Sequence, residues 1–85
     1  MLKEEQRIRA QKEARKAIDE ETLNKVFRAV GANKIDKEAT KTLKALAEEA
    51  IVEYAIRAQE IAKEREESTL NAECVACGVA RSNVF

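Results

Sequence analysis

The sequence predicts an all-α fold in which a charged N-terminal extension precedes a short helix, a long helix and a second short helix. Proline is absent, glycine occurs twice in 85 residues, and aromatic residues make up 4%. Few turn formers and few β formers favour helices throughout. The chain is 38% charged and 45% apolar, which is typical of a folded domain with a very polar surface. We assign residues 1–20 to the extension and 21–85 to one domain.

The long helix is predicted between residues 36 and 65, because this stretch contains no glycine or proline and its apolar residues recur at steps of three and four. A second apolar line of Val52, Ala55 and Ile56 widens this face. Thirty residues form a rod of about 45 Å, which an 85-residue chain cannot cover alone. We therefore expect the helix to form a dimer core with a second chain. The predicted core residues are Leu43, Leu46, Ala47, Ala50, Ile51, Tyr54, Ala58 and Ile61.

A short helix is predicted on each side of the long one. In the first, Asp19 or Thr22 is the expected N-cap, an apolar stripe spans residues 23–30, and Gly31 closes the helix. Asp36 is the expected N-cap of the long helix and Asn71 that of the last helix. Gly78 should weaken the last helix by about 1 kcal/mol relative to alanine. We also expect the apolar residues Val79, Val84 and Phe85 to pack.

Charge is distributed unevenly along a chain whose formal net charge is zero. Residues 1–44 carry a charge of +4 and residues 45–85 a charge of −4, which suits a polyanion at one side of the molecule. Residues 1–18 hold six basic and three acidic side chains. They form either a solvated helix or tail, or an arm that contacts phosphates. The arm residues would be Arg7, Arg9, Lys12, Arg15 and Lys16.

Several function classes are not favoured by the composition. The chain has no histidine, no glycine-rich phosphate loop and no convergent carboxylate pair, so we predict neither an enzyme nor a small-molecule substrate or cofactor. It has no run of eighteen apolar residues and no signal-peptide core, so we expect a soluble, intracellular protein without a membrane partner.

Two cysteines, Cys74 and Cys77, form a C-x-x-C motif near the C-terminus. Zinc requires four ligands and one chain offers two thiolates without an imidazole, so we predict no metal site. We expect two small thiols that face the core in a reducing compartment. A metal shared between two chains, or a disulfide, remains the alternative.

Residues 31–36 (Gly-Ala-Asn-Lys-Ile-Asp) and 68–73 (Ser-Thr-Leu-Asn-Ala-Glu), spaced around the long helix, resemble the two loops of histone-fold proteins. The resemblance is closest to archaeal histones and core-histone-like proteins and extends from about Leu23 to the C-terminus. It implies a handshake dimer of two antiparallel chains, in which the first loop of one chain pairs with the second loop of its partner. Family members bend double-stranded DNA with little base reading. The DNA-binding residues that it implies here are Lys25, Arg28, Lys34 and Thr69, and we expect Lys37, in the first turn of the long helix, to add a phosphate contact.

The chain departs from DNA-wrapping relatives at the second loop, where Glu67 and Ser68 replace a basic pair and Cys74 occupies the place of an acid. Negative charge there repels phosphates. Glu64 lies where the family builds its contact between dimers. Two functions therefore stay open. One is a histone-like architectural protein that binds duplex DNA in the nucleoid, cytoplasm or nucleus. The other is a heterodimerising histone-fold subunit of a transcription, centromere or DNA-repair complex.

Overall fold

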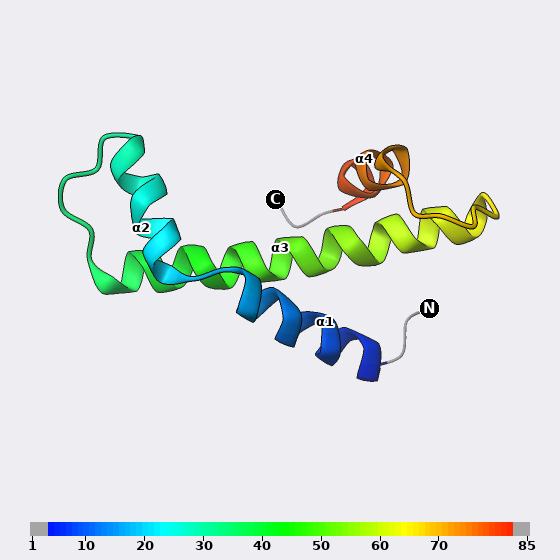
Figure 1. Cartoon of the computed structure of the whole chain (residues 1–85), viewed down its shortest axis with the longest axis horizontal. Helices are drawn as coiled ribbons and strands as arrows, with labels where there is room; N and C mark the ends of the chain where they lie inside the picture. Colours follow the sequence, from blue (N-terminus) through cyan, green and yellow to red (C-terminus); the bar gives the residue numbers. More distant parts are fainter. Residues whose placement is uncertain (1–3, 83–85) are drawn as a thin grey trace.

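The computed structural model describes residues 4–82, which form four helices and no strand (Figure 1). The helices are α1 (Glu4–Ala17), α2 (Glu20–Ala29), α3 (Lys37–Glu64) and α4 (Ala72–Arg81). The all-α prediction is confirmed. The expected packing of Val84 and Phe85 lies outside the described residues. Within this range, no helix is long and apolar enough to cross a bilayer.

Helix α3 has 28 residues and is the central helix of a molecule that measures 48 × 26 × 20 Å. The three shorter helices each contact α3, and none of the three contacts another. In Figure 1, α2 and α4 lie beside the two ends of α3, and α1 runs along its opposite side. The fold is therefore an open arrangement around one rod, with little core shared between the short helices.

The helix starts follow the predicted capping residues. The Oδ1 atom of Asp19 accepts a hydrogen bond of 2.7 Å from the backbone N–H of Thr22, so Asp19 and not Thr22 is the cap of α2. Asp36 caps α3 through the N–H of Ala39 at 2.8 Å, and Asn71 caps α4 through a corresponding bond of 3.0 Å. Each cap satisfies an N–H group that has no partner inside its helix.

Helices α2 and α3 end in the same type of turn, but the residue with positive φ differs between them. After α2, Gly31 has φ of 100°, and Ala32 N–H donates to the Phe27 carbonyl at 3.0 Å. After α3, Glu66 has φ of 56°, and Glu67 N–H donates to the Ala62 carbonyl at 2.9 Å. Both are Schellman motifs. A glutamate in this conformation carries a steric cost of roughly 1–2 kcal/mol that glycine avoids.

The core consists of two separate clusters on α3. Near the middle of α3, Val52 and Ile56 are buried against Ala14 of α1, with Ala10 packed beside them. Near its C-terminal end, Ile61 and Ala62 are buried against Cys74 of α4, with Cys77 beside them. Helix α2 has no buried residue. Its polar link to α3 is a 2.6 Å hydrogen bond from the Thr40 hydroxyl to the Asn24 side-chain oxygen.

The residues predicted to form a dimer core differ in how far one chain already covers them. Ala50, Ala58 and Ile61 are buried within the chain, and Leu43, Ala47 and Tyr54 are half-buried. Leu46 and Ile51 remain 46% and 47% exposed. Large apolar side chains are also exposed at Val26 of α2, at its C-cap residue Val30, and at Val75 and Val79 of α4. Large apolar side chains of all three helices are thus exposed in a single chain.

Candidate nucleic-acid interface

Four of the predicted DNA-binding residues lie together at the N-terminal end of α3. Lys25 and Arg28 belong to α2, Lys34 to the following loop, and Lys37 is the first residue of α3; all four are exposed. In the described part of the chain, none of the four side chains forms an ion pair. Their ammonium and guanidinium groups are therefore available to an external anion.

Arg28 and Lys37 line one depression of about 450 Å³ between α2 and α3. Asn24 and Thr40 lie in its wall, where their mutual hydrogen bond fixes α2 against α3. Glu20 also lines this depression and places one negative charge there. The complete lining consists of Glu20, Asn24, Arg28, Asn33, Ile35, Lys37 and Thr40. Amide and cationic donors thus surround a polar hollow that contains a single acid.

Electrostatics around the cap of α2 also involve these cations. The backbone N–H of Thr22 holds the pKa of Asp19 below its ordinary value of 3.8, and the positive charges of Lys25 and Lys44 act in the same direction. Asp19 is exposed, so solvent weakens its interaction with these lysines.

Thr69, the fifth predicted DNA-binding residue, lies in the exposed loop that follows α3. The whole of α3 separates this loop from Lys34, and the two loops lie at opposite ends of the molecule in Figure 1. A 28-residue helix spans about 42 Å. One chain therefore does not bring Lys34 and Thr69 together. Only a second, antiparallel chain could do so.

The end of α3 near Thr69 is acidic, and its arginines are engaged. Arg65 contacts a Glu73 carboxylate oxygen at 3.2 Å and the Cys77 Sγ at 3.6 Å. The Cys77 sulfur, and secondarily Glu73, raise the pKa of Arg65 above its ordinary value. Arg81 similarly forms a 2.7 Å ion pair with Glu64. These pairs fasten α4 to α3 and leave Glu66 and Glu67 exposed in the loop.

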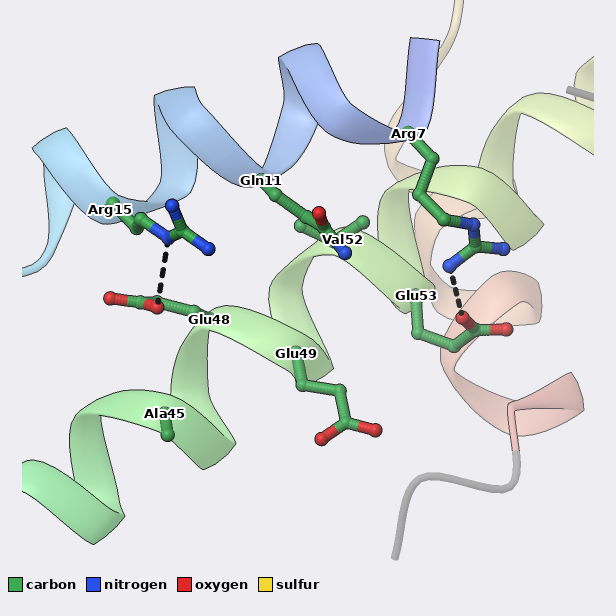
Figure 2. Close-up of a pocket in the computed structure, with 8 residues that line it drawn as sticks. All are labelled: Arg7, Gln11, Arg15, Ala45, Glu48, Glu49, Val52 and Glu53. Atoms are coloured by element: carbon green, nitrogen blue, oxygen red, sulfur yellow. Dashed lines mark ion pairs between the residues drawn. The ribbon is translucent and has the colours of Figure 1, made fainter. Parts of the chain in front are cut away.

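Two of the five predicted arm residues form ion pairs with α3 while staying partly exposed to solvent. Arg7 lies 3.5 Å from a Glu53 carboxylate oxygen, and Arg15 lies 4.0 Å from one of Glu48 (Figure 2). The order of the pairs makes α1 antiparallel to α3. The extension is therefore a docked helix, and these two arginines are shared with carboxylates.

The other three arm residues, Arg9, Lys12 and Lys16, are exposed. Their spacing of three and four residues places them on the same side of α1. Lys16 lies 3.5 Å from Glu13, an exposed pair that contributes little to stability. The outward side of α1 thus carries these three cations together with Glu13.

Lys44 is an important residue that the sequence analysis did not single out. Its Nζ donates hydrogen bonds to the backbone carbonyls of Ile18 at 2.7 Å and Arg15 at 3.3 Å, and it also contacts Glu48. A lysine at these last carbonyls stabilises the C-terminal end of α1. Of these contacts, only the one with Glu48 could be expected from the sequence, because the two residues are four positions apart on one helix. The contact with α1 depends on the fold.

The cysteines are placed largely as expected. Cys74 has no exposed surface and Cys77 is half-buried, and both are free thiols. Among residues 4–82, no three potential metal-ligating side chains come together.

Comparisons of the chain with protein-family models, curated proteins and solved structures found no match. The chemistry of the interface therefore follows from its side chains. Exposed lysines, arginines and asparagines bind anions through charge and hydrogen bonds. A helix N-terminus beside them adds a positive dipole end.

Proposed function

We propose that this chain is a histone-like architectural protein that dimerises through α3 and binds the phosphates of duplex DNA without reading bases. The observation that carries the proposal is the arrangement around α3. Short helices pack beside both ends of one long helix, large apolar side chains of all three helices are exposed, and four cations that form no ion pair within residues 4–82 lie on α2, in the loop after it and at the first residue of α3. Each part has a physical role in a dimer on DNA.

Dimerisation accounts for the apolar side chains that one chain leaves uncovered. Leu46 and Ile51 on α3 are almost half exposed, and Val26 and Val79 on the flanking helices are similarly accessible. A second α3 crossing in the antiparallel direction would cover all three helices at once. It would also bring Lys34 of one chain beside Thr69 of the other, and the resulting dimer would carry two basic ends.

Phosphate binding accounts for the four cations without carboxylate partners. Each lysine or arginine that meets a phosphate releases counterions, so binding should weaken steeply as salt increases. Base reading requires side chains that reach base edges in a groove. Arg28 and Lys37 line the hollow between α2 and α3, and Lys25 and Lys34 are exposed on α2 and in the loop after it, an arrangement that favours contact with the sugar–phosphate backbone.

The alternative function is a heterodimerising histone-fold subunit with weak DNA binding of its own. The acidic loop favours it, because Glu66 and Glu67 are exposed beside Thr69 and Arg65 is paired with Glu73. A homodimer would place these acids next to the basic end of its partner. Light scattering on the purified chain distinguishes the two functions. A soluble homodimer supports the first, and a chain that aggregates until a partner is co-expressed supports the second.

Lys34→Glu is expected to weaken binding of a short duplex by roughly tenfold for any sequence, and to leave the dimer intact. Each dimer would lose two phosphate contacts, so the slope of log affinity against log salt should become shallower by about two. Fluorescence anisotropy at two salt concentrations measures both effects.

The matched control for Lys34→Glu is Lys63→Glu, because Lys63 is exposed at the acidic end of α3. This variant reverses the same charge at a position outside the proposed phosphate-binding set, so it should bind more tightly than Lys34→Glu does. Equal losses for Lys34→Glu and Lys63→Glu would show that net charge alone governs binding. Full binding by Lys34→Glu at moderate salt would move the phosphate site to α1.

A further inference from the structure

A polar groove separates α1 from α3 where two packed helices normally interdigitate. Figure 2 shows Arg7 and Arg15 of α1 facing Glu53 and Glu48 of α3 across it, with Gln11 over Val52 between them. The groove has a volume of about 300 Å³. Its lining consists of Arg7, Gln11, Arg15, Ala45, Glu48, Glu49, Val52 and Glu53. Helix α1 is thus held largely by charged groups at the rim of a cleft that water can enter.

The apolar contact beneath this groove is small on the α1 side. Ala10 and Ala14 are the residues of α1 that pack on Val52 and Ile56, whereas the larger Ile8 is 45% exposed. Two alanines remove little apolar surface from water. An isolated helix of fourteen residues is also marginal in water. The position of α1 therefore depends on its contacts with charged side chains of α3.

The two ion pairs between α1 and α3 are long and partly exposed, and a third polar link is the donation from Lys44 to the carbonyls at the end of α1. The separations of 3.5 Å for Arg7–Glu53 and 4.0 Å for Arg15–Glu48 exceed those of a charge-assisted hydrogen bond, about 2.7–2.9 Å. The arginine side chains are 39% and 67% exposed. Pairs of this kind are weak and are screened by salt. A polyanion can compete for both arginines.

The acids of α3 have other partners on their own helix. Glu53 forms a 2.7 Å ion pair with Arg57, which is shorter than its pair with Arg7. Glu48 contacts Lys44 as well as Arg15. Departure of α1 would therefore leave both carboxylates compensated. It would leave Arg7 and Arg15 without a negative partner.

We propose that α1 is a detachable DNA-binding arm, whose Arg7 and Arg15 are held by Glu53 and Glu48 in the free protein and pass to duplex phosphates on binding. This inference rests on the proposed function. Arg9, Lys12 and Lys16, which face solvent on the docked helix, attract the duplex first. The carboxylates of α3 compete with phosphates for these two arginines, so they limit the affinity of the free protein for DNA.

A charge-neutralising double-mutant cycle on the full chain tests this exchange. The four proteins are the unmodified chain, Glu48→Gln/Glu53→Gln, Arg7→Gln/Arg15→Gln, and the chain with all four changes. Neutralising the acids should raise duplex affinity roughly five- to tenfold while the arginines are present, because two exposed ion pairs no longer compete. It should raise affinity by about twofold or less once the arginines are glutamines.

The arginine variant by itself should bind nearly as well as the unmodified chain, because it removes the competing ion pairs and the phosphate contacts together. Glu49→Gln is a control in the same groove, since Glu49 is exposed and forms no ion pair within the described residues. Its effect on affinity should stay within about twofold. Circular dichroism verifies that every variant is folded.

Amide hydrogen exchange of residues 4–17 in the free chain provides a readout that does not involve DNA. Neutralising Glu48 and Glu53 should accelerate this exchange by a factor similar to the gain in affinity, because both reflect undocking of α1. An equal gain in affinity in both arginine backgrounds would overturn the inference, and so would unchanged exchange. In either case the proposed DNA-binding function would stand. If no variant bound the duplex at low salt, the proposed function itself would fail.

Discussion

Ile51→Asp is expected to abolish the dimer and to remove most of the helical circular dichroism signal. Ile51 is 47% exposed on α3 of a single chain, so a carboxylate there would cost a monomer little. In a dimer built on α3, the same carboxylate would be buried without a partner. Such burial costs several kcal/mol, which a chain of 85 residues cannot offset. The size of the effect therefore reports directly on whether α3 is an interface.

Ile51 is a sharper test position than its neighbour Ala50. Ala50 is 5% exposed within one chain, so a charge there would unfold a monomer as well as a dimer. Ala45→Asp serves as the control, because Ala45 is exposed on α3 and borders the groove beside α1. Mass from light scattering and helicity from circular dichroism should remain unchanged in this control. A folded Ile51→Asp chain with the mass of a dimer would contradict the handshake arrangement.

Local features of this fold could be predicted from sequence because their causes lie within a few residues. The caps at Asp19, Asp36 and Asn71 need only a side-chain oxygen beside the first turn of a helix. Gly31 ends α2 because its φ of 100° costs a glycine little. The same turn after α3 was not predicted as such, because Glu66 occupies the left-handed position and no glycine marks it.

Contacts between elements far apart in sequence were predicted less well. The pattern indicated that Val52 and Ile56 widen the apolar face of α3, but it did not indicate what covers them. Alanines of α1 cover them, and two alanines in a highly charged segment give almost no amphipathic signal. The roles of Lys44 and Arg65 were missed for a related reason. Both act on partners that become neighbours only when the helices pack.

The five predicted phosphate-binding residues lie at two different ends of α3, according to where they stand in the sequence. Lys25, Arg28, Lys34 and Lys37 are close in sequence, so a helix, a loop and a helix start bring them to one end of α3. Thr69 was included on the resemblance alone, and one chain keeps it at the far end of that helix. Whether it joins the other four depends on a second chain, which is why the dimer must be tested before the interface.

Gly78→Ala is expected to destabilise the fold, although helix propensity by itself predicts the opposite. Alanine in the interior of α4 should add about 1 kcal/mol of stability relative to glycine. However, a Cβ atom on residue 78 would lie 2.7 Å from the backbone nitrogen of Ala58 and 3.0 Å from its Cα. Backbone atoms cannot rotate out of the way, so α4 would have to move off α3.

The cost of that movement should exceed the gain in helix propensity. Cys74 has no exposed surface and Ile61 is 1% exposed, so even a small shift of α4 opens gaps in a close-packed cluster. Overpacking of this kind typically costs about 1–3 kcal/mol. We expect a net loss of up to about 2 kcal/mol in the free energy of unfolding, measured by urea denaturation. The half-buried Cys77 should also react faster with a thiol reagent.

Ala76→Gly is the matched control, because it replaces alanine by glycine, the reverse of Gly78→Ala, at an exposed position of the same helix. This variant should lower the free energy of unfolding by about 1 kcal/mol, because glycine has a lower helix propensity. The reactivity of Cys77 should change less in it than in Gly78→Ala. Destabilisation by both exchanges would show that packing against Ala58 outweighs propensity at residue 78. If Gly78→Ala instead stabilised the chain, α4 could not lie this close to α3. The Arg65–Glu73 and Arg81–Glu64 pairs, which depend on that close approach, would then not form as described.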